Sequence, residues 1–173
     1  MSEKERVFAR LIGLHTAVDS RSHGLVQLHR ERLKCERGCW GCCVDGLTVF
    51  EVEAERIRRT HPDLLARGRP HVEGACAFLD HQGACRIYED RPYVCRTQGL
   101  PLRWLEGDGE VDAFELRDIC PLNEIAKEPV EDLPADSCWT IGPVEDRLGR
   151  LQEEWSDGTL RRIPLRSLFR RVG

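Results

Sequence analysis

The sequence predicts an α+β fold, a small single domain in which N-terminal helices pack on short β-hairpins and on cysteine-rich loops. Three observations support this prediction. Apolar residues recur at helical spacing near the start of the chain, two later stretches alternate around turn residues, and CERGCWGCC at residues 35–43 places four cysteines in nine positions. With 173 residues, we expect one domain over 1–173, because single cores commonly cover ~100–200 residues.

Helices are expected on both sides of the cysteine cluster. Residues 7–33 carry apolar residues three or four positions apart on both sides of Gly24, which predicts one long helix or two consecutive helices. Residues 50–68 predict a short helix that ends before Pro62, because the residue before a proline avoids the helical conformation. A further helical turn would follow and stop at Gly68.

Two hairpins are expected in the middle of the chain. ACAFLDHQGACRIY, residues 75–88, predicts two short strands joined by the turn residues DHQG, with Cys76 on one strand and Cys85 on the other. A second hairpin is predicted where LEGDGE supplies the turn between strands at 100–105 and 111–116. Its alternation of apolar and polar residues indicates one buried face.

The C-terminal part predicts one more helix and an arginine-rich end. Pro143 stands where a helix would begin, and Gly158 would stop it. Its apolar face would hold Leu148, Leu151 and Trp155. The last segment, LRRIPLRSLFRRVG, places five arginines among apolar residues. We interpret it as a final helix that packs its apolar side on the domain, and the alternative is a surface for a protein partner or a weak attraction to membranes.

Composition and charge indicate a soluble cytoplasmic protein with no nucleic acid partner. The formal net charge is −4, which gives no electrostatic reason to expect nucleic acid or an anionic membrane as a partner. The start of the chain carries charges where a secretory signal would be apolar, and no segment approaches the ~20 apolar residues of a membrane span. Thiols stay reduced in the cytoplasm, so nine cysteines favour metal binding or catalysis over disulfides, which would leave one cysteine unpaired.

The spacing of the clustered cysteines is typical of metal ligands. Cys39 and Cys42 are separated by two residues including Gly41, and Cys35 and Cys39 by three residues including Gly38. Two thiolates at such a spacing can fold back on one soft cation, and glycine eases the backbone into the turn. The cysteine-rich loops are therefore expected to be metal-binding loops.

The adjacent residues Cys42 and Cys43 are unlikely partners for one ion, because neighbouring side chains diverge on a strand and on a helix. Either they serve two metal centres, or one of them bridges or supports the other. Eight cysteines would suffice for two sites of four thiolates, although bridging would change that count. The candidate metal ligands are Cys35, Cys39, Cys42, Cys43, Cys76, Cys85, Cys95 and Cys120.

The cysteine pattern resembles the YkgJ-like cysteine-cluster family, also described as the CxxCxxCC putative zinc- or iron-chelating domain. The resemblance rests on CERGCWGCC and on ACAFLDHQGACRIYEDRPYVCR, residues 75–96. The second stretch has the family's cysteine followed by Phe or Leu and an acidic turn. It then has the family's Cys-x-Ile-Tyr, an acidic residue, Arg-Pro and a final Cys-Arg. The resemblance is firm over 35–96 and extends toward Cys120.

The resemblance implies a metal-binding domain whose ion is zinc or iron. One departure is that three residues, ERG, separate Cys35 from Cys39, where the family's usual pattern has two. Some larger relatives look like flagellin lysine methylases with an iron-sulfur cluster, and this chain does not inherit their reaction from the resemblance alone.

Zinc and an iron-sulfur cluster both stay open as the cofactor. Sets of four cysteines bind either one, and spacing does not separate them. Basic residues near the cysteines would offset thiolate charge and donate N–H groups to sulfur, or would be ordinary surface ion-pair partners. These residues are Arg37, Arg86, Arg91 and Arg96.

An iron-sulfur centre of the radical S-adenosylmethionine type is less favoured. Cys35, Cys39 and Cys42 satisfy its CxxxCxxC spacing, but Gly41 stands where an aromatic residue is usual, and too few residues follow for the usual barrel. A thiol- or cluster-dependent oxidoreductase, or a methyltransferase-type enzyme or accessory, is the alternative function, because CxxC dithiols react when one thiolate is stabilised. No serine-histidine-acid set or phosphate-binding glycine loop is visible in the sequence, so no catalytic residue is assigned.

A few other residues receive weaker predictions. Pro92 would fix a turn that presents Cys95, and Trp40 would either shield the cluster from water or fill the core. Cys138 is expected to be structural or a free thiol, with ligation as the alternative. The loop histidines are expected to be solvated rather than ligating, and these are His61, His71 and His81.

Overall fold

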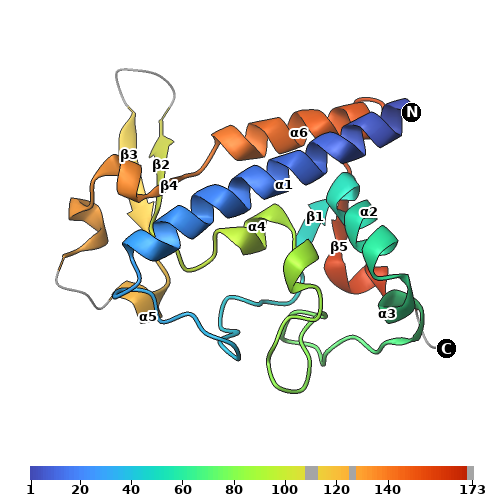
Figure 1. Cartoon of the computed structure of the whole chain (residues 1–173), viewed down its shortest axis with the longest axis horizontal. Coiled ribbons are helices and arrows are strands. Elements are labelled where there is room, and N and C mark those ends of the chain that lie inside the picture. Colours follow the sequence, from blue (N-terminus) through green and yellow to red (C-terminus); the bar gives the residue numbers. More distant parts are fainter. Residues whose placement is uncertain (108–112, 125–127, 171–173) are drawn as a thin grey trace.

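A long N-terminal helix forms the spine of the molecule. The computed structural model describes residues 1–107, 113–124 and 128–170. Helix α1 runs from Glu3 to Leu28, and helix α6, Pro143–Trp155, lies beside it (Figure 1). The predicted N-terminal helical stripe is thus one long helix, and the predicted helix that begins at Pro143 is confirmed.

The sequence of α1 explains its start and its buried face. The Ser2 side chain accepts a hydrogen bond from the backbone N–H of Glu5 and so caps the helix. The expected stripe turns inward along most of the helix, whereas Val26 and Leu28, near its end, are exposed. The buried residues of α1 are Val7, Leu11, Leu14, His15, Val18, Ser22 and Leu25.

Two short helices follow the cysteine loop, as predicted. Helix α2 spans Glu51–Thr60, and helix α3 spans Pro62–Arg67. The break between them falls at His61, directly before the proline, which fits the steric restriction on a residue that precedes proline. Helix α2 lies between the two main apolar cores and contributes to both.

A two-stranded sheet joins the chain after the cysteine cluster to the C-terminal segment. Strand β1, Thr48–Phe50, pairs antiparallel with β5, Arg162–Pro164. A 3-10 helix, η4, continues from Leu165 to Leu168. The predicted final helix is therefore a strand and a 3-10 helix. Its apolar side chains pack into the second core, which agrees with the expectation that this segment packs its apolar side on the domain. Residues 171–173 lie outside the described part.

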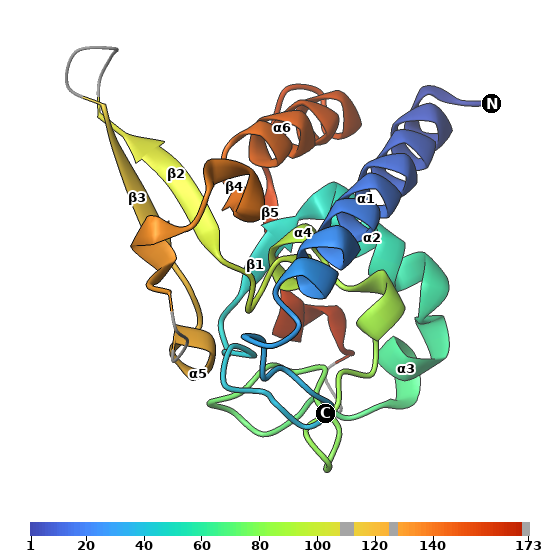
Figure 2. The ribbon, with the colours of Figure 1, turned by 60° about the vertical axis from the view of Figure 1, so that its left-hand side comes forward.

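The second hairpin is present with its strands shifted along the chain. Strand β2, Leu102–Glu106, pairs antiparallel with β3, Phe114–Asp118, and parallel with the short strand β4, Trp139–Thr140. The predicted strands began two or three residues too early, and residues 108–112 of the turn lie outside the described part. Figure 2 shows this hairpin extending away from the helices.

The first hairpin is much less regular than predicted. In residues 75–88 the two expected strands reduce to one isolated antiparallel bridge, between Leu79 and Cys85. Short helical turns complete the fold around this segment and beyond it. They are η1 Tyr88–Asp90, α4 Tyr93–Arg96, α5 Pro121–Glu124, η2 Val130–Asp132 and η3 Ala135–Ser137.

Two apolar cores flank the cysteine-rich region. The first lies among α1, α2 and α6 and includes Trp139 and Tyr93. The second joins α2, α3, β1 and the C-terminal segment to the cysteine hairpin, where Phe78 stacks 4.9 Å from Phe169 between ring centroids. The cysteine-rich loops thus extend from packed elements.

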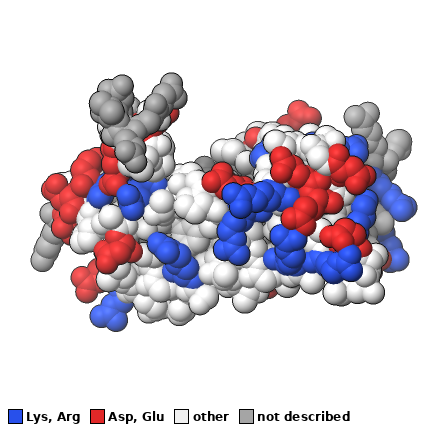
Figure 3. Space-filling model, turned by 90° about the horizontal axis from the view of Figure 1, so that it is seen from above, with Lys and Arg blue, Asp and Glu red and all other residues white. Residues whose placement is uncertain are grey.

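Acidic and basic side chains are interspersed on the face of the molecule shown in Figure 3. Several of the charges pair between elements, such as Arg10 of α1 with Glu154 of α6, and Arg59 of α2 with Glu5 of α1. Within the described residues, no helix is both long enough and apolar enough to cross a bilayer.

Candidate metal centre

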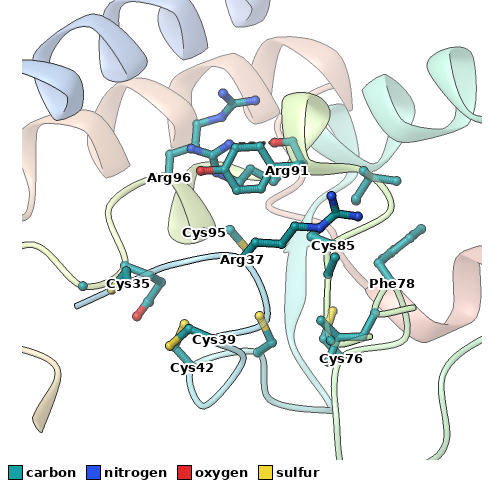
Figure 4. Close-up of a pocket in the computed structure, with 18 of the residues that line it drawn as sticks. Cys35, Arg37, Cys39, Cys42, Cys76, Phe78, Cys85, Arg91, Cys95 and Arg96 are labelled. Atoms are coloured by element: carbon teal, nitrogen blue, oxygen red, sulfur yellow. Dashed lines mark hydrogen bonds between the residues drawn. The ribbon is translucent and has the colours of Figure 1, made fainter. Parts of the chain in front are cut away.

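A single pocket collects most of the sequence-predicted ligands. It has a volume of about 940 Å³ and lies between α1, the cysteine loop, the cysteine hairpin and α4. Figure 4 shows Cys39 and Cys42 on one side of this pocket and Cys76 and Cys85 on the other. Seven of the eight predicted ligands line it: Cys35, Cys39, Cys42, Cys43, Cys76, Cys85 and Cys95.

Tight turns shape the cysteine loop itself. The backbone N–H of Cys39 donates to the carbonyl of Glu36 at 2.9 Å, and that of Cys43 donates to the carbonyl of Trp40 at 2.8 Å. Gly38 adopts a φ of 91°, a backbone conformation that residues other than glycine rarely take. The turns bring the four sulfurs of this loop to one end of the molecule. Trp40 neither fills the core nor is enclosed, because half of it is exposed.

The cysteine hairpin is tied to the cysteine loop through its backbone. The N–H of Cys76 donates to the carbonyl of Cys43 at 2.8 Å. Within the hairpin, the N–H of Arg86 donates to the carbonyl of Phe78 at 2.9 Å. The Asp80 carboxylate accepts the N–H groups of Gln82 and Ala84, which closes the turn. Cys76 and Cys85 are therefore held near each other and near Cys43.

Helix α4 presents Cys95 from a buried platform. Pro92 immediately precedes the helix with extended backbone, and its carbonyl accepts the N–H of Cys95 at 3.0 Å. The N–H of Tyr93 donates to the buried carboxylate of Glu53 at 2.8 Å. The Tyr93 hydroxyl donates to Glu145 of α6 at 2.6 Å. These bonds fix the position of a helix that is only four residues long.

The eighth predicted ligand, Cys120, approaches Cys35 through a shared asparagine. The N–H of Asn123 donates to the carbonyl of Cys120 at 2.7 Å, and its side-chain amide donates to the Cys35 sulfur at 3.4 Å and to the carbonyl of Gly99 at 2.8 Å. The side-chain oxygen of Asn123, Oδ1, accepts the backbone N–H of Lys34 at 2.7 Å. Asn123 is fully buried, so it acts as a fixed link between the two segments.

Gly99 makes room for the Cys35 sulfur. Its φ is 88°, and a Cβ atom at this position would stand 2.6 Å from that sulfur, well inside van der Waals contact. A glycine is therefore needed here for two reasons, one conformational and one steric.

Arg166 of the C-terminal segment joins both cysteine loops. Its guanidinium binds the Asp45 carboxylate through two nitrogens, at 2.9 and 2.8 Å. It also donates to the carbonyl of His71 at 2.6 Å and to that of Ala75 at 2.8 Å. Asp45 follows Cys43 by two residues and Ala75 precedes Cys76, so one side chain ties the two segments together.

Four arginines were predicted to stand near the sulfurs. Arg86 donates to the carbonyls of Phe78, Ala77 and Arg69, and Arg96 pairs with Asp19 of α1. Arg91 donates to the carbonyl of Tyr88. Each therefore has an ordinary structural contact. Arg37 lies in the pocket, as Figure 4 shows, and has no hydrogen bond or ion pair to another described residue.

Burial and mutual charge govern the thiols. Burial raises the pKa of Cys76 and Cys85 and raises that of Cys95 to about 12, and Arg86 opposes this effect at Cys76 and Cys85. A hydrogen bond from Cys43 lowers the pKa of Cys42 to about 6, and the same bond together with burial raises the pKa of Cys43. Most of these thiols are thus stabilised in the neutral form until a cation offsets the charge of the thiolates.

The sulfurs are gathered but are not arranged as a finished coordination shell. Within the described residues, no three His, Cys, Asp or Glu side chains form a group that could hold a metal ion as it stands. The cysteines lie on turns and a short helix rather than on long regular elements.

The remaining candidates lie apart from the sulfurs or have other contacts. His61 is bonded to Asp90 through Nε2 at 2.9 Å. Cys138 is fully buried in a separate apolar cluster with Ile119, Val130 and Leu133. Its position favours the structural interpretation. Neither His71 nor His81 lines the pocket; His81 is exposed and His71 is half-buried.

Sequence reasoning missed Asn123, Gly99, Glu53 and Arg166. These residues lie outside the cysteine motifs or belong to no recognisable sequence pattern. Each acts through a contact that only the folded chain creates. The single available signal was that Asn123 follows Cys120 by three residues, the length of a turn.

A comparison with protein families gives one match to this region. The model described as "CxxCxxCC: Putative zinc- or iron-chelating domain" matches residues 34–121, which is just over half of the 173 residues. The match begins directly before Cys35 and ends directly after Cys120, so it contains all eight predicted ligands. Neither the search of curated proteins nor the search of solved structures gave a match.

Proposed function

We propose that this chain, which belongs to the CxxCxxCC family of zinc- or iron-chelating domains, functions by holding zinc or iron through cysteine thiolates. The metal would be bound either as zinc ions or as an iron-sulfur cluster. The proposed ligands are Cys35, Cys39, Cys42, Cys43, Cys76, Cys85, Cys95 and Cys120.

One observation carries this proposal: sulfurs from three separate segments of the chain line the same pocket. Cys138, in contrast, is fully buried in an apolar cluster outside the pocket, as expected of a cysteine that serves only as a small apolar residue. The surroundings also fit a bound metal. The Cys35 sulfur occupies the space that Gly99 leaves open, and it accepts an N–H from Asn123, as metal-bound thiolates commonly do.

The donor set suits soft or borderline cations. Thiolates select zinc and iron-sulfur clusters over hard cations such as magnesium or calcium, which take oxygen ligands. When bound, the metal would offset the charge of several thiolates at once, which the raised pKa values of the buried thiols make necessary.

Metal analysis of the purified chain tests the proposal. The chain should be prepared under anaerobic conditions without chelators, and its zinc, iron and acid-labile sulfide measured together with its absorption spectrum. Colourless protein with stoichiometric zinc supports zinc sites, and brown protein with iron and labile sulfide supports an iron-sulfur cluster. Protein without a stoichiometric transition metal contradicts the proposal.

Four cysteine variants test which residues hold the metal. Replacing any one of Cys39, Cys42, Cys76 or Cys85 by serine should release metal and lower the melting temperature, because metal binding and folding of these loops are coupled. The matched control is Cys138→Ala, which removes a thiol outside the pocket and leaves no unpaired hydroxyl in the apolar cluster. Full metal retention and unchanged melting in all four variants would contradict the assignment.

A second candidate function is an enzyme that uses the centre, of the oxidoreductase or methyltransferase type. The exposure of Cys35 and Cys42 favours it, because a thiolate centre that solvent reaches can also meet a small substrate, whereas a closed structural zinc site has no open position. Cobalt-loaded protein tests this function, since an accessible centre would change its visible spectrum on addition of imidazole. An unchanged spectrum supports a purely structural centre. We expect either function to operate in the cytoplasm, where thiols stay reduced.

A further inference from the structure

We infer that the eight sulfurs divide into two sets of four, each of which holds its own metal centre, and that the sets meet at the bond between Cys42 and Cys43. This inference rests on the proposed function and adds the number of centres and the ligands of each. The first set is Cys35, Cys39, Cys42 and Cys120, and the second set is Cys43, Cys76, Cys85 and Cys95.

The first set is assembled by Asn123. Its backbone N–H binds the carbonyl of Cys120, and its side chain binds the Cys35 sulfur, so the last of the proposed ligands in the sequence is tied to the start of the cysteine loop. The tight turn from Glu36 to Cys39 then places Cys39 on the same side. In Figure 4, Cys39 and Cys42 lie together on the side of the pocket toward Cys35.

The second set is assembled by the hairpin and α4. The N–H of Cys76 binds the carbonyl of Cys43, which joins the end of the cysteine loop to the hairpin. The bridge between Leu79 and Cys85 folds the hairpin so that its two cysteines face the same pocket wall. Helix α4 then adds Cys95 from the adjacent platform.

The junction explains why the cysteine loop contains two adjacent cysteines. Consecutive Cα atoms are ~3.8 Å apart, and neighbouring side chains leave the backbone in different directions. One residue can therefore serve each centre while the two centres stay close. Because Cys42 and Cys43 are consecutive in the chain and both line the pocket, the two sets adjoin rather than lie at opposite ends of it.

A cobalt(II) titration of the full chain under anaerobic, reducing conditions tests the number of centres. Four-thiolate cobalt has intense sulfur-to-metal charge-transfer absorption, which can be counted against added metal. We expect saturation at two equivalents per chain, both with the four-thiolate spectrum. Saturation at one equivalent overturns the division, and so does a second equivalent that lacks thiolate absorption.

Paired variants test the membership of each set. Cys35→Ser with Cys120→Ser should reduce binding to one four-thiolate equivalent, and Cys76→Ser with Cys95→Ser should do the same. The control Cys138→Ala should keep two. A double variant drawn from both sets, Cys35→Ser with Cys95→Ser, should keep no intact four-thiolate site. The division is overturned if this mixed variant retains one intact four-thiolate site. It is also overturned if a double variant within one set removes the four-thiolate absorption of both centres.

Each double variant within one set should keep one four-thiolate metal ion. That ion also shows that the variant is folded, because a four-thiolate spectrum requires the segments that carry the four cysteines to converge. Failure of the wild-type chain to bind cobalt, zinc or iron at all would overturn the proposed function itself. Binding of metal with a different stoichiometry or a different grouping overturns only the division into two sets.

Discussion

Arg166 and Asp45, 121 positions apart in the sequence, form a two-nitrogen ion pair at 2.9 and 2.8 Å. The hydrogen bonds from Arg166 hold the pKa of the Asp45 carboxyl at about 2. Because Arg166 also binds the backbone before Cys76, the pair makes the C-terminal segment a support for the cysteine-rich loops. This is a different role from the partner surface considered for the arginine-rich segment.

Replacing Arg166 by methionine should weaken metal binding about 10–100-fold, the usual cost of losing a residue that orients metal ligands. Arg166→Lys should recover only part of the loss, because an ammonium group does not reproduce the planar pair of donors. The measurement is metal affinity by competition with a chelator of known strength. Arg162→Met is the matched control, since Arg162 binds Thr48 and no residue of the cysteine loops. Equal affinities in the two methionine variants would show that Arg166 does not support the site.

Replacing Gly99 by alanine should displace the Cys35 sulfur. The added Cβ would meet that sulfur at 2.6 Å, and the φ of 88° would add a strain of ~1–2 kcal/mol for a residue other than glycine. We expect lower stability and loss of the metal held by Cys35, measured by denaturation and by metal content. Gly13→Ala is the control, because its exposed position in α1 has no atom within 4 Å of the new Cβ. That variant should be more stable by ~0.5–1 kcal/mol. Unchanged metal content in Gly99→Ala would contradict the steric role.

A buried histidine predicts part of the pH dependence of stability. Arg56 donates to Nδ1 of His15 at 2.8 Å, so that nitrogen carries a lone pair, and Nε2–H donates to Glu53 at 3.3 Å. Only the neutral ring satisfies both contacts. Burial lowers the pKa of His15 below 6.5, with Glu53 opposing this effect and Arg96 and Arg56 adding to it.

The unfolded chain therefore binds a proton at His15 more readily than the folded chain does. The contribution of neutral His15 to stability is present in full above pH 6.5, and it is lost as the pH falls below that value. The slope for one proton is at most ~1.4 kcal/mol per pH unit. His15→Gln, whose amide can donate to Glu53 and accept from Arg56, should flatten this part of the curve. Denaturation between pH 8 and 5 measures the difference between the two chains and removes effects common to both, including thiolate protonation. Identical slopes would show that His15 binds its proton equally well in the folded and unfolded chains.

The sequence predicted the helices well because their signals are local. The apolar stripe of α1 repeats every three or four residues, and Pro62 and Pro143 mark the starts of α3 and α6 directly. The cysteine hairpin was predicted too regular, because its backbone bonds go partly to the cysteine loop and its side chains pack on the second core. The arginine-rich end was predicted as a helix, whereas pairing with β1 draws it into a strand.

The sequence predicts which cysteines belong to the candidate site, but it does not predict how they are arranged in space. Cysteine spacing identifies the thiols, but no spacing indicates that Cys120 approaches Cys35 or that Cys76 pairs with Cys43, since both contacts join distant segments. The supports for these contacts are ordinary residues whose chemistry has no pattern along the chain.

Removal of metal should loosen the cysteine loops while the helical core stays folded. The first core packs α1 against α6 through Leu11, Leu148 and other residues that do not depend on the thiols. The loops, in contrast, have few regular backbone bonds of their own. After metal is removed by a strong chelator under anaerobic, reducing conditions, hydrogen exchange should accelerate at the amides of Cys43, Cys76 and Arg86 and stay slow in the middle of α1. The metal-loaded chain at the same pH is the control. Loss of protection throughout α1 would mean that the metal holds the whole domain together, and unchanged exchange in the loops would mean that their order does not depend on metal.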